Sequence, residues 1–343
     1  MVFYTMNNLN LGEQPKDEMS RMDLAQVGHV VDRVRAFMTR DVMGRDDVIE
    51  LILVALFGGG HVLLEDYPGS GKTTLAKALG SALKPDLPDA DLAAFRRIQF
   101  TPDLLPSDVT GVMVFDPQTN DFHFRRGPIF AQIVLVDEIN RTSPKVQSAL
   151  LESMGEGQVT IDNVSYQLDD LFFVIATQNP LDSVGTYPLP VAQLDRFLFK
   201  ISMKHVSRDA ELDVLDTWGT PNQKSHLDPV SKQSILSARQ AIHQSVHVAK
   251  EVKECLVDLA RTIRDDTRTA QGVSTRSLVQ AIPALQTLAV IRGRDYIAPS
   301  DIERLSPHLF HHRISVVPGA GQVDDILADA IKAPIDALNR STI

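Results

Sequence analysis

Short runs of apolar residues alternate with stretches of helical periodicity between residues 27 and about 205. The apolar runs are 61–65 (HVLLE), 133–136 (IVLV) and 171–176 (LFFVIA), and each is bounded by a turn or a polar cluster. Strands of a parallel sheet that is covered by helices on both faces have unbroken apolar runs of this kind. The pattern therefore predicts an α/β domain built on a parallel sheet.

Two segments depart from this pattern because their apolar residues alternate with polar ones. The first spans 112–124 around the turn 116–121, and the second spans 159–168 around Asp162-Asn163. This alternation around turn residues predicts two β-hairpins. Spacing alone leaves two interpretations open. The hairpins either complete the fold as surface ribbons or project toward a substrate or a neighbouring subunit.

Beyond His205 the sequence predicts helices only. Ser300 and Glu303, behind Pro299, have the spacing of a capping box that starts one of these helices. Two apolar stripes recur at 3.6-residue spacing, and they consist of Val252, Leu256, Leu259 and Ile263, and of Leu278, Ile282, Leu285 and Ala289. We expect a loosely ordered polar tail over 1–22, an α/β core over 23–206, and a linker helix with a helical domain over 207–343.

The composition narrows the class of protein. Hydrophobic residues make up 43% and charged residues 23%, as in an ordinary globular protein. A formal net charge of −10 argues against a protein that coats nucleic acid, because neutralising phosphates requires a surplus of Lys and Arg. The single cysteine, Cys255, allows no internal disulfide, which indicates a reducing compartment such as the cytoplasm. We find neither a signal-peptide pattern nor a membrane-spanning run, so we expect no membrane insertion.

The strongest chemical signal lies between the apolar run 61–65 and a predicted helix over 72–83. Small glycines let backbone N–H groups approach a triphosphate, and the helix N-terminus adds partial positive charge. In this arrangement Lys72 reaches the β- and γ-phosphates of ATP, and the Thr73 hydroxyl binds Mg²⁺. The loop residues that would hold the nucleotide are Pro68, Gly69, Ser70, Gly71, Lys72, Thr73 and Thr74. The full pattern has glycine where this chain has Asp66. A glycine-rich turn before an ordinary helix is the alternative.

Polar residues follow the other two apolar runs. Asp137 and Glu138 come directly after 133–136, where Asp137 is placed to hold Mg²⁺ and Glu138 to polarise the attacking water. Asn179 follows 171–176 and is placed to hydrogen-bond the γ-phosphate or that water. Taken singly, the two acids could form a solvated strand end, and an Asn before Pro180 could form a turn.

The chain resembles the AAA+ ATPases and, within them, the MoxR family. The similarity runs from about residue 44 to 313. It rests on the segments 100–108 (FTPDLLPSD), 127–130 (GPIF), 137–141 (DEINR), 147–152 (QSALLE), 176–180 (ATQNP), 185–190 (GTYPLP), 193–197 (QLDRF) and 272–276 (GVSTR). The resemblance implies an AAA+ P-loop core with β-hairpin inserts, followed by an all-helical lid domain. It also implies that the protein assembles into a ring, typically a hexamer.

The resemblance assigns roles to further residues. Arg196 looks like the arginine finger given to the γ-phosphate of the neighbouring subunit, although spacing alone favours a pair with Asp195. Arg276 looks like the second sensor, which reaches from the lid to the nucleotide of its own subunit. Gly44 and Arg45 would lie near the adenine. With Glu138 and Asn179, the two arginines complete the expected catalytic set.

The resemblance also implies a function. ATP hydrolysis would change the angle between core and lid, and the ring would remodel a protein client, as a chaperone that matures enzymes or inserts metals or cofactors. A partner with a von Willebrand factor A domain is expected on the same ground, while the client remains unidentified. Segment 207–232 looks like the extra helix of this group, or it is a plain linker.

Three rival functions remain open. Arg125 and Arg126 at the end of the first hairpin favour a nucleic-acid motor, against which the acidic net charge stands. A chelatase subunit that drives insertion of a metal ion into a ring cofactor is the second. A small-molecule P-loop kinase is the third, and it would need an acceptor pocket and no arginine from a neighbour.

Overall fold

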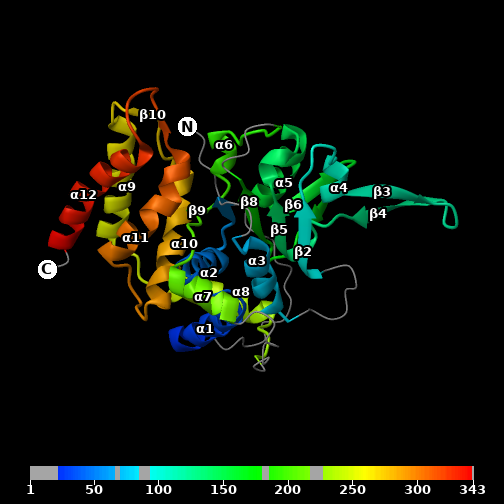
Figure 1. Ribbon diagram of the computed structural model, residues 1–343, viewed down its shortest axis with the longest axis horizontal. Coiled ribbons are helices and arrows are strands. Elements are labelled where there is room, and N and C mark those ends of the chain that lie inside the picture. The colour runs from blue at the N-terminus through cyan, green and yellow to red at the C-terminus, as the bar shows by residue number, and fades with distance from the viewer. Residues whose placement is uncertain (1–21, 66–69, 85–92, 180–184, 217–226, 342–343) are drawn as a thin grey trace.

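The structure is a computed structural model that describes residues 22–65, 70–84, 93–179, 185–216 and 227–341. Figure 1 shows a sheet with its flanking helices and two hairpins on one side of the molecule, and the helices of residues 250–341 on the other. The predicted tail over 1–22 lies outside the described residues except for its last one. The α/β core and the mainly helical C-terminal region match the fold predicted from the sequence.

The central sheet has five parallel strands in the order β2-β5-β8-β1-β9. In chain order they are β1 (Val62–Glu65), β2 (Ala93–Gln99), β5 (Ala131–Asp137), β8 (Phe173–Gln178) and β9 (Phe199–Ser202). The three predicted apolar runs form β1, β5 and β8, the three central strands, which are buried almost throughout. The two edge strands, β2 and β9, have no continuous apolar run.

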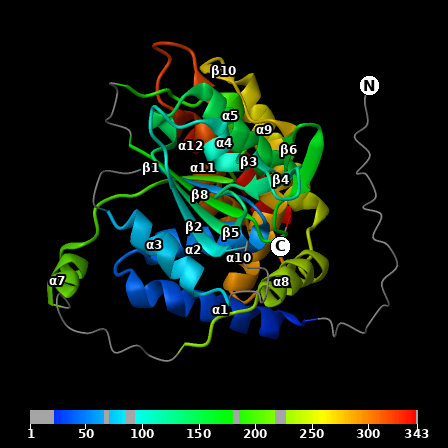
Figure 2. The same cartoon turned by 90° about the vertical axis from the view of Figure 1, so that its right-hand side faces the viewer.

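Helices cover both faces of this sheet, as Figure 2 shows. The helices of one face are α1 (Leu24–Asp41), α2 (Asp46–Gly58) and α3 (Lys72–Ser81), and those of the other include α4 (Pro106–Thr110) and α5 (Pro144–Glu156). Successive residues of β5 enter different cores, with Ile133 and Leu135 facing α1 to α3 and Val134 and Val136 facing α5. The unbroken apolar run of β5 follows from this burial on both faces. Helix α3 ends at Ser81, two residues before its predicted end.

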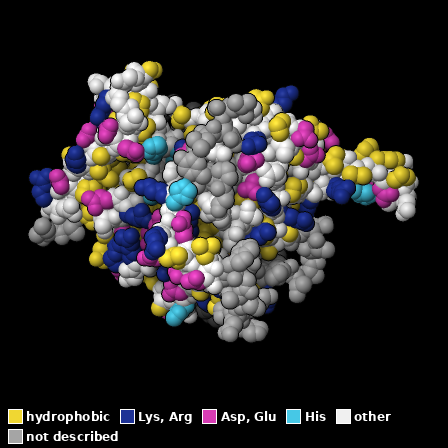
Figure 3. All heavy atoms as spheres, in the orientation of Figure 1, with side chains coloured by type: hydrophobic (Ala, Val, Ile, Leu, Met, Phe, Trp, Pro, Cys, Tyr) yellow, Lys and Arg dark blue, Asp and Glu magenta, His cyan; other side chains and the backbone are white. Residues whose placement is uncertain are grey.

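Both predicted hairpins are present as antiparallel pairs. They are β3 (Gly111–Asp116) with β4 (Asp121–Arg126), and β6 (Gln158–Ile161) with β7 (Val164–Gln167). Asp162 and Asn163 have φ values of 48° and 64°, which a two-residue turn requires at both positions. Phe124 stacks on Tyr166 at 4.1 Å, so the hairpins contact each other at the root of the first one. The outer part of β3–β4 projects from the body of the protein (Figures 1 and 3).

The C-terminal region contains the predicted helices. Its elements are α7 (Arg208–Asp216), α8 (Lys232–Ser245), α9 (Lys250–Asp265), α10 (Thr275–Ile291), α11 (Pro299–Phe310), the 3₁₀ helix η2 (His311–Arg313) and α12 (Val323–Ser341). The prediction of helices only is wrong, because β10 (Thr269–Gln271) and β11 (Ser315–Val316) form an antiparallel ribbon. These strands are too short to show a period of two in the sequence.

The predicted capping box at Ser300 and Glu303 is also wrong. Helix α11 begins at Pro299, and its N-cap is Ala298, whose N–H donates to the Asp301 carboxylate at 2.8 Å. Proline suits the first helical position because the N–H that it lacks has no partner inside the helix there. Pro299 therefore begins the helix itself rather than preceding its cap, and Asp301 is the residue that reaches back.

Candidate active site

The carboxyl ends of β1, β5 and β8 lie at one edge of the sheet because the three strands are parallel neighbours. Ser70 and Gly71 follow β1, and Asp137 and Glu138 stand at the end of β5. Asn179 follows β8, which runs between the other two strands. Ligands of open α/β sheets bind at this edge. The structure thus brings the three predicted clusters to the same edge, while Pro68 and Gly69 lie outside the described residues.

Helix α3 begins at Lys72, directly after Gly71. Gly71 has a φ of 90°, which only glycine adopts without strain, and it lets the chain turn sharply into the helix. Lys72 and Thr73 are half-buried in the first turn, and Thr74 is more exposed. The backbone N–H groups of this turn and the helix dipole make it a suitable place for an anion.

A pocket of about 550 Å³ opens beside this turn, lined by Arg45, Ser70, Gly71, Thr74, Lys204, His205 and residues of α7, among others. Gly44 lies next to it with a φ of 67°, and a Cβ there would come within 2.5 Å of the Ala210 Cβ on α7. Only glycine therefore lets the chain pass this close to α7. The structure brings Gly44, Arg45 and the loop before α3 together around one pocket.

Two polar residues of the pocket wall are Arg45, which is buried, and Ser70, which is half-buried. Arg45 donates to the backbone carbonyls of Lys204 and, at 3.4 Å, Ser70, which ties the start of α2 to the loop before α3. The Arg45 Nε and the Ser70 Oγ are buried and find no hydrogen-bond partner in the part of the chain that is described. Because buried polar groups are nearly always hydrogen-bonded, two unpaired atoms next to one pocket fit a wall that receives a polar ligand.

Asp137 and Glu138 are both held by neighbouring side chains. Asp137 is 6% exposed, and it accepts from the Arg97 Nε at 2.6 Å and from the Thr177 hydroxyl at 3.3 Å. Glu138 has a left-handed φ of 59°, and its N–H donates to the Thr177 Oγ1 at 3.0 Å. Thr177, on β8, therefore fixes the end of β5 through both acids.

The Glu138 carboxylate has two further partners. It accepts from the Gln99 Nε2 at 3.0 Å and pairs with the Arg141 Nε at 3.2 Å. Sequence reasoning missed Arg97 and Gln99 because β2 lacks an apolar run. The parallel register of β2 and β5 places Gln99 beside Asp137 and Arg97 beside Leu135, which brings both side chains to the acids.

The two predicted arginines lie at the boundary between the sheet and the C-terminal helices. Arg196 follows α6 (Val191–Leu194), and a Cβ on Gly155 of α5 would lie 1.9 Å from its Nη1, so its guanidinium packs on that helix. Asp195 pairs with Arg313 at 2.7 Å, and its alternative pair with Arg196 does not form among the described residues. Arg276 is exposed in the first turn of α10. Neither arginine is among the described residues that line the pocket.

The described residues contain no group of three or more His, Cys, Asp or Glu side chains that could hold a metal ion by themselves. A Mg²⁺ ion that arrives with a nucleotide needs only one or two protein ligands, since phosphates and waters supply the rest. A site of that type therefore needs no such group of side chains. None of the described helices is both long and apolar enough to cross a bilayer.

Two family models match the chain. The model described as "ATPase family associated with various cellular activities (AAA)" matches residues 61–199, and the one described as "AAA lid domain" matches residues 261–332. The first match contains β1, β2, β5 and β8, the first residue of β9, and the two acids at the end of β5. The second contains α10, α11, η2 and the β10–β11 ribbon.

Proteins with sequences similar to most of this chain agree with these two matches. A Bacillus subtilis protein named "Uncharacterized protein YeaC" is 46% identical over 299 residues, which cover 86% of this chain and 89% of that protein. "Chaperone MoxR1" of Mycobacterium tuberculosis is 36% identical over 335 residues, which cover 92% and 82%. The crystal structure of a putative ATPase from Cytophaga hutchinsonii has a TM-score of 0.78 at 32% identity, and the match covers 90% of this chain and 95% of that one.

Proposed function

The chain belongs to the MoxR family of AAA+ ATPases, and on this basis we propose that it binds ATP with Mg²⁺ and hydrolyses it to ADP and phosphate. The observation that carries the proposal is the meeting of three parts at one sheet edge: the start of α3, the acids of β5 and the end of β8. The buried Arg45 and Ser70 atoms beside the pocket fit a polar ligand there. The core is proposed to span 23–206, and the linker helix and lid 207–343.

The residues of the first turn of α3 would hold the triphosphate. Lys72 would contact the β- and γ-phosphates. The loop 68–74 would add its backbone N–H groups, which every residue except Pro68 carries. The Thr73 hydroxyl and Asp137 would ligate Mg²⁺, whose charge neutralises the phosphates. Gly44 and Arg45 would lie against the adenine, on the side of the pocket that α7 closes.

The acids would have to leave their present partners to act. Asp137 is held by Arg97, so a metal ion competes with that guanidinium for the carboxylate. Glu138 would accept a proton from the attacking water, and it must first release Gln99 and Arg141. Asn179, which follows β8 between β5 and β1, would orient that water or the γ-phosphate.

Members of this family generally work as rings, and we propose a hexamer in which Arg196 serves the γ-phosphate of the neighbouring subunit. Arg276 would serve the nucleotide of its own subunit from the lid. The work of the ring would be chaperone-like remodelling or maturation of a protein client, in line with the relative named "Chaperone MoxR1". Insertion of a metal or cofactor and a partner with a von Willebrand factor A domain belong to the same proposal.

The cellular location is proposed to be the cytoplasm. The single cysteine, Cys255, is a buried free thiol, and burial raises its pKa to about 11. A thiol with so high a pKa is almost wholly protonated and unreactive near neutral pH. Cys255 therefore packs as a small apolar side chain in α9 and has no need of an oxidising compartment.

The first experiment compares ATP binding by the wild type and the Lys72→Ala variant. We expect the variant to lose most of its affinity for a fluorescent ATP analogue, because the cation that faces the phosphates is gone. Lys332→Ala is the matched control, since Lys332 is an exposed lysine on the last helix that pairs with Asp329. Equal affinity in Lys72→Ala and in the control would contradict the assignment of the loop.

A nucleic-acid-stimulated motor is a second candidate, which one observation favours. Arg96, Arg125 and Arg126 line a second pocket of about 520 Å³ with Phe124 and Phe130, and the Arg126 guanidinium lies 5.6 Å from the Phe130 ring centroid. Guanidinium groups beside aromatic rings suit phosphates and bases. Stimulation of ATP turnover by single-stranded DNA that disappears as salt rises would support this function. Turnover that DNA leaves unchanged at low salt would exclude it.

A further inference from the structure

Arg313 is a fully buried arginine at the contact between the two regions that the family models match. It lies in η2 and is 2% exposed. Its Nε donates to the Asp195 Oδ1 at 2.7 Å, and its Nη2 donates to the Gln280 Oε1 at 2.7 Å. Burying a guanidinium is costly unless a carboxylate pairs with it and its remaining donors are satisfied. Arg313 meets both conditions, and Asp195 comes from the other region.

The backbone on both sides of Arg196 is bound by η2. The Arg313 Nη2 donates to the carbonyl of Asp195 at 3.4 Å and to the carbonyl of Phe197 at 3.0 Å. The His312 Nε2 lies 3.1 Å from the same Phe197 carbonyl. The backbone carbonyls of the residues directly before and directly after Arg196 are therefore both held by a segment of the lid.

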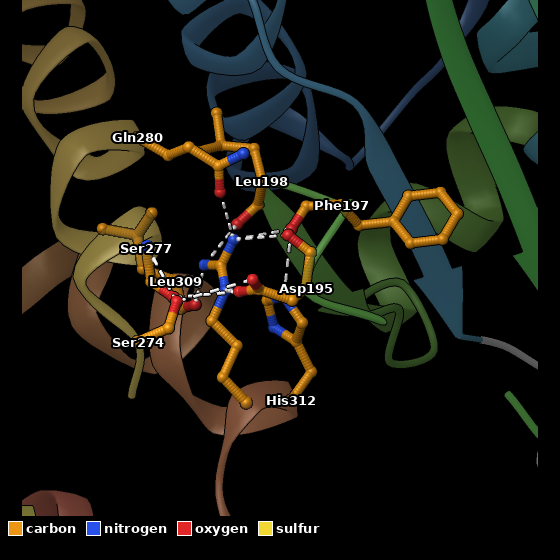
Figure 4. A network of polar contacts seen from close by, with 9 residues as sticks. Asp195, Phe197, Leu198, Ser274, Ser277, Gln280, Leu309 and His312 are labelled. Carbon is orange, nitrogen blue, oxygen red and sulfur yellow. Dashed lines mark hydrogen bonds and ion pairs between the residues drawn. The ribbon is translucent and has the colours of Figure 1, made fainter. Parts of the chain in front are cut away.

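The Asp195 side chain adds a link to the start of α10. It accepts from the Ser277 hydroxyl at 2.9 Å and from the Ser274 hydroxyl at 3.5 Å, and Ser274 is the N-cap of α10. Figure 4 shows Asp195 facing Ser274 and Ser277, with the carbonyls of Phe197 and Leu198 next to it. Arg276 stands between these two serines in the sequence. The Asp195 carboxylate thus links the residue directly before Arg196 to Ser277, the residue directly after Arg276.

From this arrangement we propose that Asp195 and Arg313 are positioning residues that fix Arg196 to the lid. The inference rests on the function proposed above for Arg196. Because η2 and the start of α10 belong to the lid, a movement of the lid carries the backbone of Arg196 with it. The lid of one subunit thereby sets whether that subunit's arginine reaches the nucleotide of its neighbour.

The test uses Ser277→Ala and Asp195→Asn, each made in the wild type and in an Arg196→Ala background. Ser277→Ala removes one hydroxyl from a fully buried site, so it perturbs the fold less than the charge change in Asp195→Asn does. Two controls match them within the lid. Ser306→Ala removes a buried hydroxyl that, within the described part of the chain, bonds to the Ile302 carbonyl of its own helix, and Asp301→Asn breaks the buried pair with Arg294.

We expect Ser277→Ala to lower the turnover number about ten- to a hundredfold, the effect of losing one hydrogen bond to a charged group, with the KM for ATP changed less than about twofold. In the Arg196→Ala background the same change should lower turnover by less than about twofold, because there is no arginine left to position. A merely structural role would lower turnover by the same factor in both backgrounds.

Each outcome decides between the two proposals. If Arg196→Ala hydrolyses ATP like the wild type, the role of Arg196 fails and the coupling fails with it. If Arg196→Ala is impaired while Ser277→Ala and Asp195→Asn act equally in both backgrounds, or no more strongly than the two controls, the coupling alone is refuted. Thermal melting of all variants reports whether the controls lose as much stability as the test variants.

Discussion

Removing Arg97 should make the protein bind Mg²⁺ more tightly in the presence of ATP. The Arg97 Nε lies 2.6 Å from the Asp137 Oδ2, and the side chain of Arg97 is 48% exposed while the side chain of Asp137 is 8% exposed. A metal ion that takes this carboxylate must displace the guanidinium. Arg97→Ala removes the competitor and leaves the Thr177 hydroxyl on the other carboxylate oxygen.

The magnitude follows from the exposure of the pair. A hydrogen bond to a charged group contributes roughly 1.5–3 kcal/mol when buried, and solvent reduces that to about 1–1.5 kcal/mol for a half-exposed arginine. Competition of this strength shifts the Mg²⁺ concentration at half-maximal turnover by about five- to tenfold. The unpaired carboxylate should also lower the free energy of unfolding of the metal-free protein by roughly 1–2 kcal/mol.

The assay is a Mg²⁺ titration of ATP turnover at saturating ATP, with urea unfolding of the metal-free protein beside it. Arg268→Ala is the control, because Arg268 forms a similar half-exposed pair with Asp266 at 2.7 Å in the lid. We expect the midpoint to fall in Arg97→Ala and to stay in Arg268→Ala. If the Mg²⁺ concentration at half-maximal turnover is as high in Arg97→Ala as in Arg268→Ala, or higher, the guanidinium does not compete with the metal ion for Asp137.

Three further predictions concern other sites. Gln99→Ala should raise turnover at saturating ATP by up to about fivefold, because the Gln99 amide holds Glu138 through an exposed hydrogen bond of 3.0 Å. Unchanged or slower turnover would show that this hydrogen bond does not restrain Glu138. Burial lowers the pKa of His61 to about 4, so the unfolded chain takes up a proton between pH 6.5 and 4 that the folded protein does not, and roughly 3 kcal/mol of stability is lost over that window as pH falls. The free energy of unfolding, measured with urea, should therefore depend less on pH in His61→Asn than in the wild type. It should keep the wild-type pH dependence in a control variant of the exposed residue His29. An equal slope in the two variants would contradict this role of His61. Arg196→Ala should lower turnover about 10³-fold, and mixing it with Lys72→Ala should restore part of the activity if the arginine acts across a subunit boundary.

The central strands were predictable because burial on both faces leaves a clear trace in the sequence. β5 places alternate residues in two different cores, so every position is apolar until Asp137. The glycine-rich loop and the acids could then be placed at one edge from strand ends alone. The two hairpins were predictable for a similar reason, since their turn residues occupy φ values that few residue types adopt.

The edge strands and the partners of the acids were not predictable in the same way. β2 reads AAFRRIQ, and both arginines and Gln99 are exposed, so its sequence has neither an apolar run nor a strict alternation. Arg97 and Gln99 reach the acids only through the register of β2 on β5, which a single sequence does not specify. Their contacts were therefore visible only once the strands were paired.

Arg313 shows a second limit of sequence reasoning. Arginine is among the residue types that are almost never fully buried, so a sequence pattern places it on a surface. Here a single carboxylate from residue 195 and a set of backbone carbonyls allow it to be buried between two regions that are distant in sequence. Neither partner set has a local signature. The link between Arg196 and the lid therefore depends on tertiary structure alone.

The measurement that tests the account most directly is the fate of ATP bound to Glu138→Gln, followed by phosphate release and by chromatography of the bound nucleotide. The account predicts that this variant binds ATP with Mg²⁺ like the wild type and keeps it as ATP, while Glu156→Gln, a change at the exposed end of α5, hydrolyses ATP at the wild-type rate. Release of phosphate by Glu138→Gln at the wild-type rate, or failure of the wild-type protein to hydrolyse ATP, would contradict it.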